Sequence, residues 1–313
     1  GQRFEGNLTA EIKTFVENSE GCFNVSDIDR EFGLTTRADK KRRTEALRYL
    51  INKSVITRDR RVSGKYHILT TELDFVDLDC VQESAFPLVL PLDLDHMVTI
   101  PPKAIVVLAG SSNSGKTAFL LNVLRCNLNQ NYPLLYLMSE MGGQEYKSRL
   151  SLFGDPLDQW KRIKAAPKSA GFNAAVAQFN QNGLTVVDFL EEVEGEYHKI
   201  ASDIRAIYDA LGDGVAFIAL QKRRDQHIGR GGEATTEKAR LYLSLDNLVH
   251  RPRCTVAGMR IVKAKSYPGD NPNGLERHFK ILRGSQLEPL SKWMYCNDAQ
   301  REQYIKQYQK MLE

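Results

Sequence analysis

One octapeptide limits what this 313-residue chain can fold into more than any other feature. It spans residues 110–117 and has the sequence Gly-Ser-Ser-Asn-Ser-Gly-Lys-Thr. The apolar, β-rich residues 105–109 precede it, and residues 118–121 continue as a helical segment. A glycine-rich loop between a strand and a helix is the context that gives the pattern GxxxxGK[ST] its physical meaning. The chain is therefore expected to contain an α/β domain built around this loop.

The residue types in this loop suit the phosphates of a nucleotide. In such loops, backbone N–H groups surround phosphate oxygens at the positive end of the following helix. Lys116 would neutralise charge on the β- and γ-phosphates, and the Thr117 hydroxyl would ligate Mg²⁺. We therefore expect ATP and Mg²⁺ as cofactors. The residues expected to bind the nucleotide here are Gly110, Ser111, Ser112, Asn113, Ser114, Gly115, Lys116, Thr117 and Ala118.

Two acidic residues at the ends of predicted strands are candidates for the chemistry around the phosphates. Asp188 closes the apolar run 184–187, where it would complete the nucleotide and Mg²⁺ site together with Thr117. The alternative is that Asp188 caps the following helix. Glu140 follows the run 134–139 and is the candidate that orients and deprotonates water. For Glu140 the alternative is a solvated side chain without a chemical role.

Four elements occur in the order typical of RecA/DnaB-like helicases of superfamily 4. Residues 136–141, Tyr-Leu-Met-Ser-Glu-Met, resemble the segment that supplies the catalytic glutamate in DnaB-type helicases. Residues 188–190, Asp-Phe-Leu, are similar to the family's Asp-Tyr-Leu. Residues 218–221 resemble the strand whose terminal glutamine, Gln221 here, senses the γ-phosphate. The resemblance implies a RecA-like P-loop NTPase core with catalytic roles for Lys116, Glu140 and Gln221.

The fourth element is a late strand with two lysines. Residues 261–265 resemble the strand on which this family carries a Lys-x-Arg pair that reaches the nucleotide of the neighbouring subunit. Lys263 and Lys265 occupy the two positions here, and both are expected to be catalytic. Lysine supplies positive charge but lacks the bidentate fork of arginine, so two solvated lysines on an edge strand are the alternative. An inter-subunit role implies a homo-oligomeric ring or filament with ATP between subunits.

A basic segment follows Gln221. Glycines make residues 222–240 mobile, and the basic side chains suit a phosphate backbone. In the RecA/DnaB-like class this position lines the DNA channel, which implies binding of single-stranded DNA; the alternative is a flexible loop that faces solvent. The residues expected to contact DNA are Arg223, Arg224, Arg230, Lys238 and Arg240.

The first 70 residues have the pattern of a separate small domain. Apolar residues at helical spacing predict helices in 8–19, near 25–32 and in 37–52, and residues 55–69 predict a hairpin. Three helices and a hairpin resemble a winged helix, whose third helix enters the major groove of duplex DNA. Protein docking, or a merely solvated basic face, is the alternative. The residues expected to contact duplex DNA are Lys40, Lys41, Arg42 and Arg43.

The expected organisation has four parts. They are a winged-helix (α+β) domain in 1–70, an acidic, proline-containing linker in 71–100, a RecA-like α/β ATPase domain in 101–290 and a helical tail in 291–313. Short apolar runs that alternate with helical stretches indicate a mostly parallel sheet in the third part. The predicted strands are 104–109, 134–138, 184–189, 215–220, 259–262 and 278–282.

Composition excludes several classes of protein. The chain is 42% hydrophobic and 26% charged, and it has no run of about 18 apolar residues, so no membrane association is expected. Its five cysteines form no CxxC pair, which argues against a zinc site or a disulfide framework and favours a cytoplasmic setting. A net charge of +4 is too small to imply nucleic-acid binding by itself.

These features together predict an ATP-dependent DNA translocase or helicase that acts in replication. The primase-interacting domain of DnaB-type helicases is not recognisable, so a phage or mobile-element replication protein, or the carboxyl-terminal part of a primase-helicase, is the expected context. The alternative is an ATP-switched DNA-binding or loading protein without unwinding activity. A nucleotide kinase is a third possibility, and the basic loop and the lysine strand argue against it.

Overall fold

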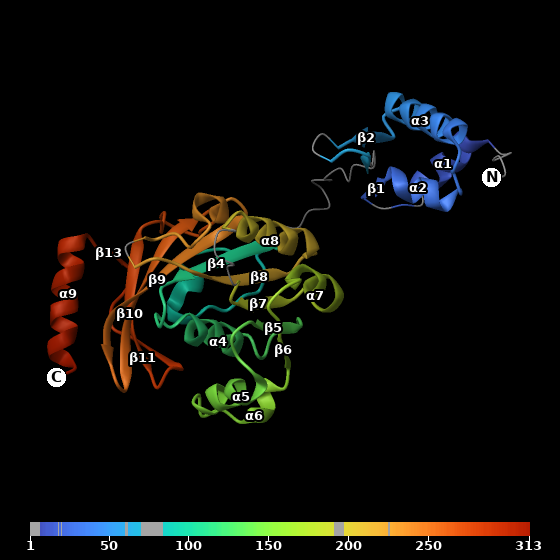
Figure 1. Cartoon of the computed structure of the whole chain (residues 1–313). Helices are drawn as coiled ribbons and strands as arrows, with labels where there is room; N and C mark the ends of the chain where they lie inside the picture. Colours follow the sequence, from blue (N-terminus) through green and yellow to red (C-terminus); the bar gives the residue numbers. More distant parts are fainter. Residues whose placement is uncertain are drawn as a thin grey trace. The chain divides into compact units, whose positions relative to one another are not determined.

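The computed structural model divides the chain into two compact units, Gly1–Gln82 and Glu83–Glu313 (Figure 1). Within the part of the chain that is described, no helix is both long and apolar enough to cross a membrane. The residues whose structure is described are 7–17, 19, 21–59, 62–69, 84–190, 197–224 and 226–313.

The first unit combines three helices with a small antiparallel sheet in the order β1-β3-β2. The predicted helices and hairpin are confirmed, because their apolar residues, among them Ile12, Ile28 and Leu50, form one buried core. The strand β1 was not predicted, and the winged-helix assignment stays a prediction. The elements are α1 (Leu8–Glu17), β1 (Cys22–Asn24), α2 (Val25–Glu31), α3 (Arg37–Asn52), β2 (Ile56–Arg58) and β3 (Lys65–Ile68).

The second unit is a mixed α/β structure around a ten-stranded sheet in the order β12-β11-β10-β9-β4-β8-β7-β5-β6, with β13 paired to β11. The strands from β9 to β6 in this order are parallel, and β10 to β13 form an antiparallel extension. The strands are β4 (Ala104–Gly110), β5 (Leu134–Met138), β6 (Ile163–Pro167), β7 (Leu184–Asp188), β8 (Val215–Gln221), β9 (Ala239–Arg251), β10 (Cys254–Ala264), β11 (Leu275–Leu282), β12 (Gln286–Pro289) and β13 (Met294–Tyr295).

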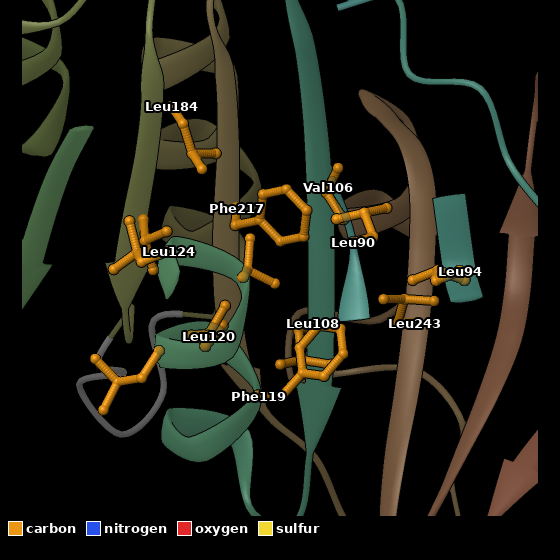
Figure 2. Packing of buried hydrophobic residues seen from close by; sticks show 14 of the residues in the cluster. Leu90, Leu94, Val106, Leu108, Phe119, Leu120, Leu124, Leu184, Phe217 and Leu243 are labelled. Carbon is orange, nitrogen blue, oxygen red and sulfur yellow. The ribbon is translucent and has the colours of Figure 1, made fainter. Parts of the chain in front are cut away.

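Two hydrophobic layers enclose the parallel strands. Along β4, Val106 and Leu108 face the layer that contains α4, whereas Ile105 and Val107 face the layer that contains α7 and α8. Figure 2 shows the first layer, in which Phe119 of α4 packs near Leu108. The helices are α4 (Lys116–Cys126), α5 (Gly143–Ser151), α6 (Leu157–Trp160), α7 (Phe172–Phe179), α8 (Tyr197–Ala210) and α9 (Asp298–Met311), with 3-10 helices η1 (Pro91–His96) and η2 (Gly232–Thr236).

The expected α/β class and the central parallel strands are present, and each predicted strand coincides with β4, β5, β7, β8, β10 or β11. A strand buried on both faces is a run of apolar residues, which is why these strands are visible in the sequence. The identification of the sheet as a RecA-like core stays a prediction.

Residues 84–100 are not part of a linker. Leu92 and Leu94 are buried in the core of the second unit, and the intervening Asp93 pairs with Arg277 of β11 at 2.7 Å. The Asn127 side chain donates a hydrogen bond to the carbonyl of Val89 at 2.7 Å. Acidic residues and prolines gave this segment the composition of a linker, although its leucines belong to the core. The rest of the predicted linker lies outside the described residues.

Strand β9 was also missed. Its first residues were assigned to the basic loop, because buried polar residues, Ser244 and Asp246, interrupt its apolar pattern. The predicted tail contains α9, whose Tyr308 packs against Val249 of β9 and Val256 of β10. In Figure 1, α9 lies alongside the antiparallel strands.

Candidate nucleotide-binding site

The glycine-rich loop joins β4 to α4 in a compact turn. A Cβ atom at Gly110 would lie 2.5 Å from the Ser114 Oγ, so this position accepts only glycine. Gly115 has φ 97°, in the left-handed region that favours glycine, and a Cβ atom there would lie 2.1 Å from Cδ1 of Ile281. The loop is therefore shaped both by its own backbone and by β11, which packs against it.

Lys116 is buried at the start of α4 and has no direct ion pair within the part of the chain that is described. Its Nζ donates to the backbone carbonyls of Gly110 and Ser111, each at 3.1 Å. Burial lowers the pKa of Lys116, whereas the nearby carboxylates of Asp188 and Glu140 act in the opposite direction. The buried Ser114 hydroxyl has no hydrogen-bond partner among the described residues. Both groups are thus available to an anion that enters the loop.

Asp188 ends β7 beside this loop and is itself buried. Its Oδ2 accepts a hydrogen bond from the Tyr136 hydroxyl at 2.7 Å. Burial raises the pKa of Asp188, while hydrogen bonds from the hydroxyls of Tyr136 and Thr117 act in the opposite direction. Mg²⁺ prefers oxygen ligands, of which proteins commonly supply one or two alongside substrate phosphates and water. The adjacent oxygens of Thr117 and Asp188 fit such a site.

Glu140 and Gln221 follow the strands on either side of Asp188. Glu140 is exposed after β5, which pairs with β7, and the Ser139 amide donates to the Asp188 carbonyl at 3.0 Å. Gln221 ends β8 opposite Gly110 of β4, and the next amide, of Lys222, donates to the Gly110 carbonyl at 3.1 Å. Parallel strands thus deliver both side chains to the edge of the sheet that carries the loop.

These residues surround one cavity of about 430 Å³. Lys116, Thr117, Glu140, Asp188 and Gln221 all line it. The volume lies in the range of small-molecule sites, about 300–1,000 Å³. The predicted site residues on these four segments of the chain therefore converge on one place. Among the described residues, no group of three or more His, Cys, Asp or Glu side chains could hold a metal ion.

A further part of the cavity lining was missed by the sequence analysis. It contains Arg251 at the end of β9, Arg253 in the turn before β10 and Arg283 after β11. The Arg283 amide donates to the Arg253 carbonyl at 3.4 Å, and the Asn247 side chain donates to the carbonyl of Asn113 in the loop at 3.4 Å. The signal was the run His-Arg-Pro-Arg at 250–253, but it cannot be placed without β9. The cavity therefore has positive charge of its own on two walls.

Lys263 and Lys265 do not line the cavity. Strand β10 runs antiparallel to β9, so its last residues lie at the edge where the parallel strands begin. The Lys263 Nζ donates to the Thr236 carbonyl, and the Lys265 amide donates to the Arg240 carbonyl at 3.0 Å. Burial lowers the pKa of Lys263, and the charges of Lys265 and Arg240 add to the effect. A role in a neighbouring subunit's site stays a prediction.

The basic residues of the 222–240 segment separate into two groups. Arg223 and Arg230 line a second cavity, of about 560 Å³, and Arg224 is exposed nearby in the chain. Lys238 instead lies over the ring of Tyr208, with its Nζ 4.4 Å from the centroid, and Arg240 lies beside Lys265. The residues of the expected DNA-binding set therefore differ in their surroundings, and their role in DNA binding stays a prediction.

On α3 of the first unit, the four basic residues differ in their surroundings. Lys40 and Lys41 are exposed, and Arg42 is half-buried. Arg43 forms an ion pair with Asp29 of α2 at 2.5 Å, and its side chain is only 13% exposed. Arg43 therefore joins two helices, while Lys40 and Lys41 remain on the surface.

Comparison with known proteins adds no name to this site. No family model matches the chain, and no curated protein matches its sequence at a significant level. The function is therefore argued from the chemistry of the site.

Of the five cysteines, Cys22, Cys126, Cys254 and Cys296 are free thiols, and Cys80 lies outside the described residues.

Proposed function

We propose that this chain is a Mg²⁺-dependent ATPase of the RecA/DnaB-like class that acts on DNA, as a translocase or helicase in replication. One observation carries the proposal. Lys116, Glu140, Asp188 and Gln221, which are far apart in the sequence, line one cavity at the edge of the parallel sheet where the glycine-rich loop lies. Lys116 and Asp188 are both buried and have no direct ion partner among the residues that the structure describes, and a Mg-nucleotide would neutralise both charges.

Each residue has a separate task in this proposal. Lys116 and the loop amides bind the phosphates, and Thr117 and Asp188 would hold Mg²⁺. The metal ion, when bound, supplies charge neutralisation at the phosphates. Glu140, exposed to the cavity solvent, takes the proton of the attacking water. Gln221 contacts the terminal phosphate and passes its loss to the segment that begins at Lys222.

The DNA and oligomer parts of the proposal rest on charge. Arg223, Arg224 and Arg230 follow Gln221 directly and would bind single-stranded DNA through its phosphates. Exposed Lys40 and Lys41 would meet duplex DNA if the first unit acts as a winged helix. Lys263 and Lys265, remote from the chain's own cavity, would reach the nucleotide of a neighbour in a ring or filament.

One observation favours a second function, an ATP-switched DNA-binding or loading protein that does not unwind DNA. Arg251, Arg253 and Arg283 line the cavity from the same chain as the loop. A single subunit therefore carries enough positive charge to hold a triphosphate without a neighbour. Nucleotide binding would then control assembly on DNA, and no stepping along it is required.

The test is ATP hydrolysis by the full chain with and without single-stranded DNA, followed by strand displacement on a forked substrate. We expect DNA-stimulated hydrolysis that Lys116→Ala abolishes. Lys164→Ala, an exposed lysine on β6 away from the cavity, is the matched control and should behave as wild type. Absence of hydrolysis in the wild type would reject both functions. Hydrolysis without strand displacement, together with loss of assembly in Lys116→Ala, would favour the switch.

A further inference from the structure

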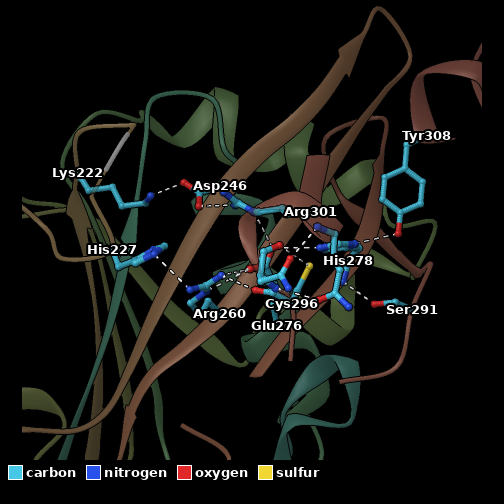
Figure 3. Close-up of polar contacts among 12 residues, drawn as sticks. Lys222, His227, Asp246, Arg260, Glu276, His278, Ser291, Cys296, Arg301 and Tyr308 are labelled. Carbon is cyan, nitrogen blue, oxygen red and sulfur yellow. Dashed lines mark hydrogen bonds and ion pairs between the residues drawn. The ribbon is translucent and has the colours of Figure 1, made fainter. Parts of the chain in front are cut away.

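A network of polar and charged side chains, several of them buried, begins one residue after Gln221 and ends on helix α9 (Figure 3). Residues from the segment after β8, from β9, β10 and β11, and from α9 take part. None of them lines the nucleotide cavity. The principal members are Lys222, His227, Asp246, Arg260, Glu276, His278, Arg301 and Tyr308.

Lys222 connects the cavity to this network. Its backbone amide donates to Gly110 at the start of the glycine-rich loop, whereas its fully buried side chain donates to Asp246 of β9. The same Nζ donates to the carbonyl of Gln226 at 2.8 Å, and the Gln226 amide donates to the Arg223 carbonyl at 3.2 Å, so that Gln226 turns back towards Arg223. A buried ammonium group needs such partners, because burying a charge without them is costly. The position of the turn after Gln221 therefore depends on Asp246.

Asp246 in turn is held by α9. Its Oδ1 accepts from Lys222 and its Oδ2 accepts from the guanidinium of Arg301 at 2.7 Å. The Arg301 Nε donates to Glu276 of β11 at 2.9 Å. Both oxygens of Asp246 are thus occupied from opposite sides. A displacement of Arg301 must rotate this carboxylate and change its contact with Lys222.

Glu276 fixes Arg301 from the other side. This carboxylate is 1% exposed and accepts hydrogen bonds from Arg260, Arg301 and His278. Burial would raise the pKa of Glu276, but these donors hold it at about 2. A Cβ atom at Gly258 would lie 2.8 Å from Glu276 Oε1, so the glycine makes room for the carboxylate. Glu276 is therefore a rigid, charged anchor for α9.

Helix α9 has a second attachment, through Tyr308. The Tyr308 hydroxyl lies 2.9 Å from Nδ1 of His278, and the Tyr308 ring packs against the His278 ring. With His278 Nε2 donating to Glu276, a neutral imidazole satisfies both contacts. Tyr308 thus holds α9 through His278 and not through Asp246 or Lys222. A substitution of Tyr308 therefore tests the packing of the helix apart from the contacts of Arg301.

We propose that α9 is a positioning element for the nucleotide site: Arg301, acting through Asp246, fixes Lys222 and so sets the position of Gln221 and of the turn that opens the basic segment. The proposal rests on the function proposed above, in which Gln221 contacts the terminal phosphate. Buried ion pairs contribute little net stability compared with apolar packing, but they specify one arrangement. Movement of α9 would release the turn between Arg223 and Gln226, and a fixed α9 keeps it closed.

The experiment compares Arg301→Gln, Arg301→Lys and Tyr308→Phe in the full chain, without nucleotide, by the rate of tryptic cleavage after Arg223 and Arg224. Arg301→Gln should accelerate this cleavage by about tenfold, because local opening exposes the turn. Arg301→Lys, which keeps the charge but loses the fork, should be intermediate. Tyr308→Phe keeps the aromatic ring that packs α9 against His278 and should resemble wild type. Thermal midpoints of all variants serve to exclude global unfolding.

Equal cleavage of wild type and Arg301→Gln would overturn the proposal. Equal acceleration by Tyr308→Phe and Arg301→Gln would overturn it too, because only helix packing would then matter. In a second measurement, Arg301→Gln should lower kcat for ATP by about tenfold with KM within about twofold, since the loop itself is intact. A wild-type chain without ATPase activity would reject the proposed function, and the cleavage rates would still decide whether Arg301 positions the turn.

Discussion

Buried charge is handled in two different ways in the second unit. In the cavity, Lys116 contacts neutral carbonyls and Asp188 contacts hydroxyls, and burial shifts both pKa values towards the uncharged forms. In the network, Asp246 and Glu276 are each bound directly by cations, and the pKa of Glu276 is held at about 2. In the cavity, the charges of Lys116 and Asp188 would be neutralised by a bound ligand. In the network, each carboxylate is already neutralised by cationic side chains, as expected if the network holds one arrangement in the absence of a ligand.

The largest effect should come from the cavity. Glu140→Gln is expected to keep ATP binding but to lower turnover by about 10²–10⁴-fold, because the amide cannot take a proton from water. The measurement is single-turnover hydrolysis alongside nucleotide binding, with Asp158→Asn on α6, an exposed partner of Lys161 away from the cavity, as the control. Unchanged turnover in Glu140→Gln would remove this residue from the mechanism.

A substitution in the network should change the stability of the fold and not primarily the turnover of ATP. Glu276→Gln is expected to lower the free energy of unfolding at pH 7 by about 3 kcal/mol. Each unit by which folding lowers the pKa of a carboxyl group stabilises the folded state by about 1.4 kcal/mol when the group is ionised. The folded pKa, about 2, is below the ordinary value of 4.5, so this stabilisation is complete above about pH 4.5 and is lost as the pH falls towards 2. Denaturant unfolding at several pH values measures it.

The matched control for this prediction is Glu288→Gln on β12. Glu288 pairs with Lys280 at 3.3 Å but is 52% exposed, and exposed pairs contribute little. Its loss should leave stability nearly unchanged at every pH. If Glu276→Gln were equally harmless, the network would not be the completed charge system described above.

A smaller effect concerns the lysines at the opposite edge of the sheet. If Lys265 serves a neighbour's nucleotide, mixing Lys265→Ala and Lys116→Ala chains in equal amounts should restore about a quarter of wild-type ATPase, because a quarter of the interfaces then pair two intact halves. Neither variant should be active alone. An active species that is strictly monomeric would exclude this shared site and leave Arg251, Arg253 and Arg283 as the cations at the phosphates.

The smallest expected effect contrasts most directly with Glu276. Because burial raises the pKa of Asp188, its ionised form destabilises the fold, and the cost appears as the pH rises through the ordinary and then the folded pKa. Asp188→Asn should therefore leave the thermal midpoint at pH 7 unchanged or slightly higher. It should also abolish the additional stabilisation that Mg²⁺ gives with ATP. A clearly lower midpoint would show that Asp188 is paired as completely as Glu276.

The sequence was most informative for strands that are buried on both faces, because such strands are continuous runs of apolar residues. The apolar run of β4, followed by the loop, predicted the centre of the sheet, and the ends of β5, β7 and β8 supplied Glu140, Asp188 and Gln221. In parallel strands these ends meet at one edge, so their convergence follows from fold class once the strands are recognised.

What the sequence could not provide depends on distant pairing. Ser244 and Asp246 made β9 look like the end of a loop, although both are buried. Ser244 pairs with Arg260 of β10, and Asp246 is bound by Lys222 and by Arg301 of α9. Without β9 there was no means of placing Arg251 and Arg253 opposite the loop. Likewise, Arg301 in a polar helix shows no sign of its contacts with two strands until the sheet is assembled.

The contact between Gly115 and Ile281 has a consequence for biosynthesis. The phosphate-binding motif is synthesised first, whereas Ile281, which packs against its last glycine, follows 166 residues later. A nascent chain that stops before β11 would carry the whole octapeptide but not the surface that shapes it. Competence to hold a nucleotide should thus arise late, after the antiparallel strands have left the ribosome and paired.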